Sequence, residues 1–256
     1  MNSNGASPRT ALVTGGGRGI GRAVAEGLAA DGFAVFIADL RREEAQEVAD
    51  AIAANGGRAH AVEADVADSD SVAAAVRAAE DAFGCIDVLV NNAGWDDLKP
   101  FLETDEAFWD RVIDINFKGP LRFTRLILPG MMERGWGRII NIGSDAGRVG
   151  SSLESVYSGA KGGLIAFTKT IARETARSGV TANVVCPGPT DTPFLHETMS
   201  AQGDADAVLG AMVKSVPMRR LAAPEEIAAA VRFFAGDEAG YVTGQTLSVS
   251  GGLTMA

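Results

Sequence analysis

A tyrosine and a lysine four positions apart are the residues whose types and spacing most clearly suit chemistry. Tyr157 and Lys161 occur in the run Tyr-Ser-Gly-Ala-Lys, and this spacing places both side chains on one face of a helix. A free tyrosine is a poor base because its pKa is ~10, but a neighbouring ammonium group favours tyrosinate and lowers that pKa. Ser144 comes 13 residues earlier, and its hydroxyl can hydrogen-bond a carbonyl or alcohol oxygen. Together they predict a general acid/base site that works near neutral pH.

A glycine-rich turn near the start of the chain is a candidate phosphate-binding loop. The apolar run that ends at Thr14 continues as Gly-Gly-Gly-Arg-Gly-Ile-Gly, and a helical stretch follows. Glycines let the backbone approach a pyrophosphate, and the first N–H groups of the helix face it. The residues expected to contact the cofactor here are Gly15, Arg18, Gly19, Ile20 and Gly21.

Asp39 ends the second predicted strand, about twenty residues after the loop. A carboxylate at this place accepts hydrogen bonds from the ribose hydroxyls of NAD and repels a 2′-phosphate, so we expect NAD rather than NADP. Arg18, Arg41 and Arg42 lie nearby in the sequence and could instead hold such a phosphate. After the third predicted strand, the candidates for the adenine edge are Asp65 and Val66.

Short apolar runs alternate with Ala-rich helical stretches along the whole chain. The strands and helices that this pattern predicts must position the candidate cofactor and catalytic residues. The predicted strands are 10–14, 34–38, 58–64, 88–91, 138–142, 181–186 and 246–249. The predicted helices are 19–31, 42–55, 69–84, 105–134, 156–178 and 224–236. Such an alternation predicts an α/β fold: a single doubly wound Rossmann domain with a seven-stranded parallel sheet flanked by helices on both faces. Ligands then bind where the strands end.

Composition narrows the class of protein further. The 256 residues carry a formal net charge of −10, which argues against a nucleic-acid partner and against attraction to anionic membranes. No apolar run approaches the ~18 residues of a membrane span, and the two histidines form no metal-ligand spacing, so we expect no metal. Two unpaired cysteines indicate a reducing compartment, and we expect a cytoplasmic protein. We expect a disordered tail over residues 1–9 and one domain over residues 10–256.

Six motifs in order resemble the short-chain dehydrogenase/reductase family over essentially the whole chain after the tail. They are Thr14–Gly21, Asn91-Asn92-Ala93-Gly94, Asn116, Ser144, Tyr157 with Lys161, and Pro187-Gly188. The resemblance implies that Tyr157 exchanges the substrate proton, that Lys161 holds the nicotinamide ribose and that Asn116 anchors a relay water. It also implies a homotetramer built through helices 105–134 and 156–178 and the last strand. The further cofactor contacts that it implies are Asn92, Ala93, Gly94, Pro187, Gly188, Thr190 and Thr192.

Less generic segments resemble a narrower group, the 2-hydroxycyclohexanecarbonyl-CoA dehydrogenases. The segments are 92–96 with 99–101, 144–152, 185–192 and 247–255. This resemblance implies NAD-dependent oxidation of a cyclic hydroxyacyl-CoA, or of a free cyclic or aryl secondary alcohol. Residues 193–217 would fold over the substrate as a lid. The expected pocket walls are Trp95, Ser144, Val149, Ser151, Ser152 and Phe194.

Two other functions stay open from the sequence. One is an NADPH-dependent 3-oxoacyl-thioester reductase, for which Asp39 is the discriminating residue. The other is a catalytically silent NAD-binding regulatory protein, against which the intact set of Asn116, Ser144, Tyr157 and Lys161 speaks. A methyltransferase would share the glycine loop and the acid but would not need this set.

Overall fold

The apolar runs predicted as strands pair in parallel as one sheet. In the computed structural model, which describes residues 8–200 and 205–255, its order is β3-β2-β1-β4-β5-β6-β7. The order reverses direction between β1 and β4, which is the switch point where ligands bind in such sheets. The strands are β1 (Thr10–Thr14), β2 (Ala34–Asp39), β3 (Arg58–Glu63), β4 (Val88–Asn91), β5 (Gly137–Ile142), β6 (Val180–Pro187) and β7 (Thr246–Val249). The expected seven-stranded Rossmann fold is confirmed.

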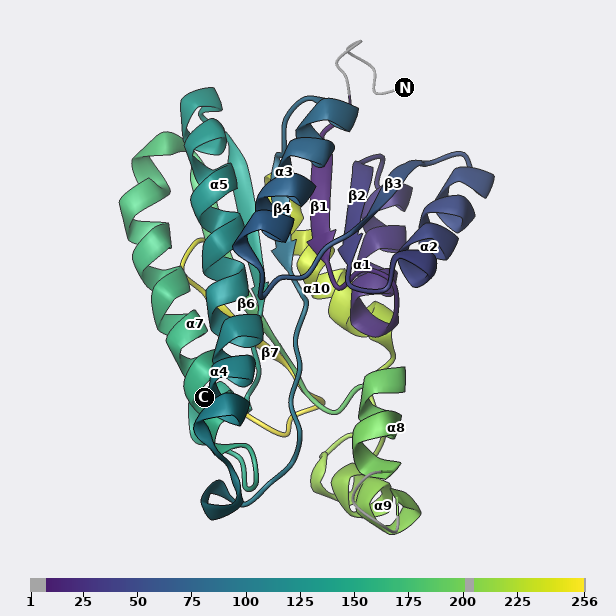
Figure 1. Ribbon diagram of the computed structural model, residues 1–256, viewed down its shortest axis with the longest axis vertical. Helices are drawn as coiled ribbons and strands as arrows, with labels where there is room; N and C mark the ends of the chain where they lie inside the picture. The colour runs from purple at the N-terminus through teal and green to yellow at the C-terminus, as the bar shows by residue number, and fades with distance from the viewer. Residues whose placement is uncertain (1–7, 201–204, 256) are drawn as a thin grey trace.

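Helices cover both faces of the sheet (Figure 1). On β1, Ala11 and Val13 belong to one buried cluster and Leu12 to the other, because successive side chains point to opposite faces. The first cluster takes in α1 (Gly19–Ala30), α2 (Arg42–Ala54) and α10 (Pro224–Ala235). The second takes in α3 (Ser69–Phe83), α5 (Gly119–Arg134) and α7 (Ser155–Thr175). Burial on both faces explains why the central strands are continuously apolar.

The helix predicted over residues 105–134 is wrong as a single element. The chain forms α4 (Glu106–Ile113), a π-helical turn (Asp114–Lys118) and then α5. Pro120 has no N–H to donate to the carbonyl four residues earlier, so the α-helical ladder cannot run through this point. The turn carries Asn116, which is fully buried. Such π-helical turns occur frequently at functional sites.

Shorter helices lie at the end of the sheet where the strands finish. They are α6 (Ala146–Val149), α8 (Pro193–Ser200) and α9 (Ala205–Ser215). In Figure 1, α8 and α9 project below the carboxyl ends of β1 and β4. They account for most of the predicted lid, whose residues 201–204 fall outside the described residues. Among the helices that the structure describes, none is long and apolar enough to cross a membrane.

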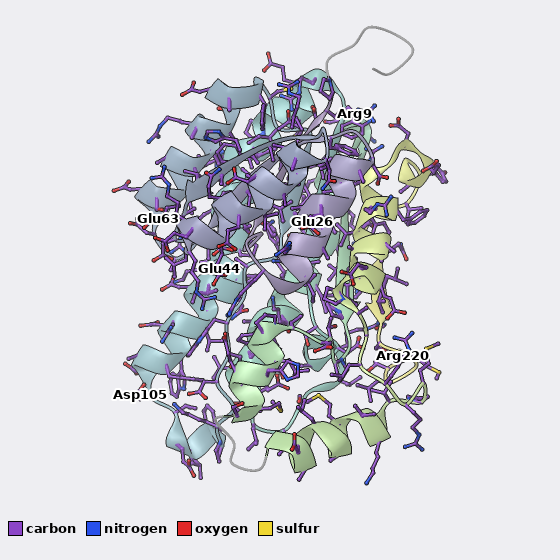
Figure 2. All side chains as sticks on the ribbon, turned by 90° about the vertical axis from the view of Figure 1, so that its right-hand side faces the viewer. Arg9, Glu26, Glu44, Glu63, Asp105 and Arg220 are labelled. Carbon is purple, nitrogen blue, oxygen red and sulfur yellow. The ribbon has the colours of Figure 1, made fainter. Side chains whose placement is uncertain are left out.

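The other end of the molecule holds the start of the described chain. Arg9 lies there, far from α8 and α9 (Figure 2). Its guanidinium is 3.9 Å from the ring centroid of Trp136 and 2.8 Å from the carboxylate of Asp237. The tail assigned to residues 1–9 therefore does not include Arg9, because an ion pair and an aromatic face hold its side chain. Residues 1–7 of that expected tail lie outside the described residues.

Candidate active site

One cavity of about 1080 Å³ runs along the carboxyl ends of the strands. Its walls come from the loops that follow β1 to β6, which are far apart in the sequence. All the residues predicted to contact a cofactor line it, as do Ser144 and the predicted walls Trp95, Val149, Ser151 and Phe194. Ser152 does not line it: its side chain is exposed outside the cavity, so this predicted wall is wrong. The volume exceeds the roughly 300–1,000 Å³ of a typical small-molecule pocket, which leaves room for a cofactor and a substrate together.

The glycine loop is tied to the loop after β4. The Asn92 side-chain amide donates to the carbonyls of Thr14 at 3.0 Å and Gly15 at 2.9 Å. The hydroxyl of Thr14 accepts the backbone N–H groups of Asn92 and Ala93, both at 3.0 Å. A Cβ at Gly21 would lie 2.0 Å from the carbonyl oxygen of Gly15, so only glycine fits there. The cradle at the start of α1 therefore fits a dinucleotide pyrophosphate.

Asp39 points back at the glycine loop from the end of β2. Its carboxylate accepts the backbone N–H groups of Gly17 and Arg41, each at 2.9 Å. The two nearby guanidinium groups are held by other carboxylates: Arg18 lies 2.5 Å from Glu197, and Arg41 lies 3.3 Å from Glu44. The surroundings of the expected adenosine ribose are therefore acidic, which suits two hydroxyls better than a phosphate.

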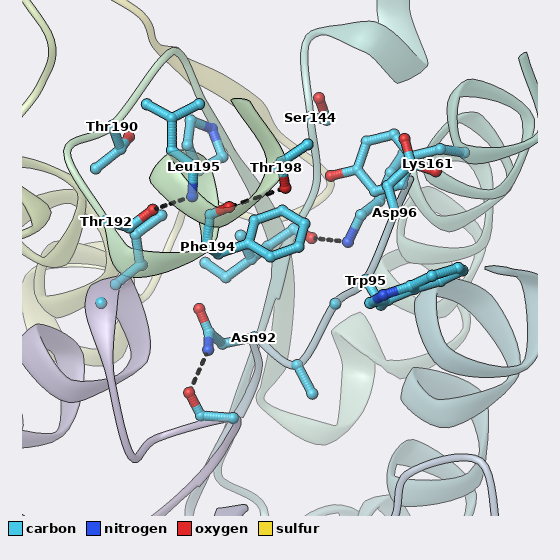
Figure 3. A pocket seen from close by; sticks show the side chains of 18 of the residues that line it. Asn92, Trp95, Asp96, Ser144, Lys161, Thr190, Thr192, Phe194, Leu195 and Thr198 are labelled. Carbon is cyan, nitrogen blue, oxygen red and sulfur yellow. Dashed lines mark hydrogen bonds between the residues drawn. The ribbon is translucent and has the colours of Figure 1, made fainter. Parts of the chain in front are cut away.

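The catalytic residues predicted from the sequence come together at the end of β5. Lys161 on α7 is buried, and its ammonium donates to the carbonyl of Ile142 at 2.8 Å. The same nitrogen is 5.5 Å from the ring centroid of Tyr157. Ser144 lies close enough to the Tyr157 hydroxyl to oppose the rise of its pKa. Figure 3 shows Ser144 and Lys161 on the same side of the pocket.

The protonation of the tyrosine differs from the prediction. Burial raises the pKa of Tyr157, and the charges of Glu154 and Asp96 raise it further. The expected net lowering of this pKa is not observed, because burial and the two negative charges outweigh the positive charge of Lys161. Burial also lowers the pKa of Lys161 to about 8. Tyr157 is therefore protonated at neutral pH and able to donate its proton.

Asn116 holds the loop after β4 in place. Its amide donates to the carbonyls of Trp95 at 2.6 Å and Val112 at 2.9 Å, and its oxygen accepts the backbone N–H of Trp95 at 3.3 Å. The side chain lies behind the cavity wall rather than on it. The structure thus gives Asn116 a positioning role, and the relay water implied by the family resemblance stays a prediction.

Asp96 and Glu154 are among the acidic cavity residues that the sequence analysis missed. Asp96 follows the Asn-Ala-Gly-Trp run of the loop after β4, and Glu154 precedes Tyr157 by three residues. Both line the cavity. The spacing of three between Glu154 and Tyr157 is a helical neighbour spacing and was a usable signal. Nothing in the sequence signals that Asp96 is buried, because burial depends on how the loop folds.

The predicted wall residue Trp95 is held by ring contacts. The Arg111 guanidinium lies 3.8 Å from its ring centroid, and Phe108 lies 5.7 Å away. On the opposite side, Phe194 of α8 is 37% exposed and reaches into the cavity mouth (Figure 3). An aromatic wall and an aromatic side chain on the lid suit an apolar substrate portion.

Comparison with known proteins settles the family. The family model described as "Enoyl-(Acyl carrier protein) reductase" matches residues 15–254. The chain belongs to the short-chain dehydrogenase/reductase family. It is an oxidoreductase that acts on keto and hydroxy groups of a small-molecule substrate with a nicotinamide cofactor.

Several named relatives of this short-chain dehydrogenase/reductase are reductases. It is 43% identical over 243 residues to the short-chain reductase protein NovJ of Streptomyces niveus, covering 94% of this chain and 92% of that protein. It is 43% identical over 250 residues to an acetoacetyl-CoA reductase of Allochromatium vinosum, covering 96% and 99%. It is 40% identical over 247 residues to the 3-oxoacyl-[acyl-carrier-protein] reductase FabG of Escherichia coli K12, covering 96% and 98%.

A solved structure supports the same family. A variant of actinorhodin polyketide ketoreductase, determined with NADPH, superposes with a TM-score of 0.92 at 35% identity, covering 96% of this chain and 97% of that one. None of these four proteins is named as a 2-hydroxycyclohexanecarbonyl-CoA dehydrogenase. The narrower resemblance stays a prediction for this short-chain dehydrogenase/reductase.

Proposed function

We propose that the protein reduces the ketone of a 3-oxoacyl thioester to a secondary alcohol, with NADH as the reductant. The observation that carries the proposal is the meeting of Ser144, Tyr157 and Lys161 in one wall of the cavity. A ketone oxygen gains negative charge as its carbon is reduced, and a neutral tyrosine can neutralise that charge by donating its proton. The reductase names of the relatives support this direction over the oxidation of a cyclic alcohol.

The residues have distinct tasks in this reaction. Ser144 and Tyr157 bind the ketone oxygen, and Tyr157 transfers its proton to it. Lys161 holds the nicotinamide ribose, and its positive charge stabilises the tyrosinate that remains after the transfer. The other predicted nicotinamide contacts, at Pro187, Gly188, Thr190 and Thr192, lie in the cavity wall after β6. The bound cofactor supplies the hydride, and the protein supplies orientation and electrostatics.

The choice of NADH over NADPH depends on Asp39. Its carboxylate faces the glycine loop, and Glu44 and Glu197 already pair with the nearby guanidinium groups. The relatives act on thioesters by their names, but those names do not state a reductant. The acidic surroundings therefore favour NADH in this chain.

The acyl chain is the less constrained part of the proposal. Trp95 and Phe194 give an apolar cavity portion that accepts linear or ring-bearing chains. The narrower resemblance implies a cyclic acyl group whose ring hydroxyl is oxidised to a ketone, which is the reverse of the proposed reaction. The corresponding cyclic ketone is therefore included in the substrate panel.

We also propose a homotetramer in the cytoplasm. The family resemblance implies contacts through α5, α7 and β7, and the exposed Leu126 and Leu247 lie on two of these elements. Cys85 and Cys186, both free, suit a reducing compartment.

A substrate panel tests the proposal. Oxidation of NADH and NADPH is followed at 340 nm with acetoacetyl-CoA, a 2-oxocyclohexanecarbonyl thioester and a free cyclohexanone. We expect turnover of acetoacetyl-CoA with NADH and a lower kcat/KM with NADPH. Turnover only of the free ketone would refute the thioester, and a preference for NADPH would refute the role of Asp39. Loss of all turnover in Tyr157→Phe, with NADH binding retained, would separate an enzyme from a silent NAD-binding protein.

A further inference from the structure

A buried carboxyl oxygen without a hydrogen-bond partner lies in the wall of the catalytic cavity. Asp96 is only 7% exposed, and its Oδ2 has no partner among the described residues. Buried polar atoms in folded proteins nearly always have a partner, and an unpaired buried carboxylate is unfavourable. An unpaired acceptor oxygen at a binding site is suited to a hydrogen-bond donor on the bound ligand.

The backbone on both sides of Asp96 is held in place at the reacting end of the cavity. Asn116 binds both backbone groups of Trp95, the residue before it. Three residues further on, the backbone N–H of Lys99 donates to the carbonyl of Leu153 at 3.0 Å. Figure 3 shows Asp96 beside Lys161 on the side of the pocket that carries Ser144. Since a terminal carboxyl torsion is soft, a small rotation turns either oxygen to the cavity.

The nearby cations are engaged elsewhere. The ammonium of Lys161 donates to the Ile142 carbonyl, and Lys99 lies 2.7 Å from Asp97. The Arg111 guanidinium lies over the Trp95 ring. Asp96 is therefore not the partner of a structural ion pair among the residues that the structure describes.

A second acid shares this wall. Glu154 also lines the cavity, and its negative charge adds to burial in raising the pKa of Asp96, which reaches about 7. Burial likewise raises the pKa of Glu154. Either protonation state of Asp96 has a free oxygen that accepts a hydrogen bond. Two acids on one wall favour an O–H or N–H donor and disfavour an anionic substituent.

We propose that Asp96, assisted by Glu154, forms a specificity subsite that accepts a hydrogen bond from a hydroxyl or amino group on the carbon next to the reacting ketone. The inference rests on the proposed function for the reaction itself and names the substrate class: ketones whose neighbouring carbon carries a hydrogen-bond donor. The expected substrates are thus hydroxy- or amino-substituted 3-oxoacyl thioesters.

Three small ketones of nearly equal shape test the subsite. Butanone, hydroxyacetone and aminoacetone carry a methyl, hydroxyl or amino group, respectively, on the carbon next to the carbonyl carbon, and they are otherwise identical. With wild-type protein and NADH, we expect kcat/KM to be higher for the two donor-bearing ketones by roughly 10- to 100-fold, as for a hydrogen bond to a charged group. In Asp96→Leu, the three values should come within about threefold of one another.

Conservative variants separate the two donors and guard against misfolding. Asp96→Asn keeps an acceptor oxygen and removes the charge, so it should retain the preference for hydroxyacetone and lose most of the preference for aminoacetone. Glu154→Gln should weaken only the preference for aminoacetone. Glu103→Gln is the control, because Glu103 is exposed and does not line the cavity, and it should leave the ratios as in wild type.

The outcomes distinguish this inference from the proposed function. Equal kcat/KM for the three ketones in wild type, or unchanged ratios in both Asp96 variants, would overturn the subsite even if acetoacetyl-CoA is reduced. Lack of turnover of acetoacetyl-CoA would refute the thioester as the substrate. The kcat/KM ratios of the three small ketones would still test the subsite. If no ketone is turned over, the rise in Tm with each ketone at matched concentration decides it: an equal rise for all three in wild type refutes the subsite.

Discussion

Replacing Asp39 by asparagine removes one negative charge from the end of β2 and keeps the shape of the side chain. The amide oxygen of the variant would still accept one of the backbone N–H groups of Gly17 and Arg41, which the carboxylate binds at 2.9 Å each. We expect the folded protein to lose about 1 kcal/mol of stability, the contribution of one hydrogen bond. The main effect should fall on the choice between NADH and NADPH.

The magnitude follows from charge and distance. Hydrogen bonds from ribose hydroxyls to a neutral amide are weaker than to a carboxylate by about 1 kcal/mol, which disfavours NADH. A 2′-phosphate of charge about −2 at about 5 Å from a carboxylate is repelled by about 2 kcal/mol in water, and the variant removes this repulsion. Arg18 and Arg41 do not offset it in wild type, because Glu197 and Glu44 hold them. The sum, about 3 kcal/mol, shifts the NADPH/NADH ratio of kcat/KM by about 100-fold.

Steady-state kinetics with both reductants measure this ratio at fixed substrate and ionic strength. Glu63→Gln is the control: Glu63 is the register partner of Asp39 on β3, one strand further from the glycine loop, and it is exposed. Screening limits the shift in this control to about threefold. A ratio in Asp39→Asn within about threefold of wild type would refute the electrostatic reasoning. Equal loss of kcat/KM with both reductants would also refute it, since that pattern indicates damage to the loop rather than a changed charge.

Three further predictions concern the catalytic end of the cavity. Tyr157→Phe should lower kcat by at least about 10²-fold through loss of the proton donor, while the rise of Tm with NADH stays as in wild type; retained turnover would exclude Tyr157 as the donor. Asn116→Ala should lower the free energy of unfolding by about 2–4 kcal/mol, because two backbone groups of Trp95 lose their partner in a buried site, and chemical denaturation measures it; a change below about 0.5 kcal/mol would contradict the positioning role. The pKa of Asp96 is raised from 3.8 in the unfolded chain to about 7, so its contribution to stability is present below pH ~4 and is lost as the pH rises through ~7. This loss is at most about 4 kcal/mol, and Asp96→Asn should flatten the corresponding slope of unfolding free energy against pH; an unchanged slope would place the titration elsewhere.

Much of the fold was readable from local sequence pattern. β1 and β4 are buried along their whole length and are largely apolar, and they begin and end at the predicted residues. The partly exposed edge strand β7 does so too. The remaining strands differ by one or two residues at their ends, where hydrogen bonding to a neighbour decides the boundary. The prediction of one long helix is wrong at the π-helical turn, because this break depends on Pro120 and on contacts of Asn116 with a distant loop.

The composition of the site was also determined by the sequence. The glycines, Asp39, Ser144, Tyr157 and Lys161 have types and spacings that fit only a few chemistries, and strand order brings them to one edge of the sheet. Their protonation was decided by the tertiary structure alone. The direction of the Lys161 ammonium, the burial of Asp96 and the partial burial of Tyr157 arise where β4, β5 and α7 meet, and solvent exclusion there raises the pKa values of both acids. A linear sequence specifies which groups meet, but desolvation is a property of the packed surroundings. For that reason these pKa shifts became visible only in the folded protein.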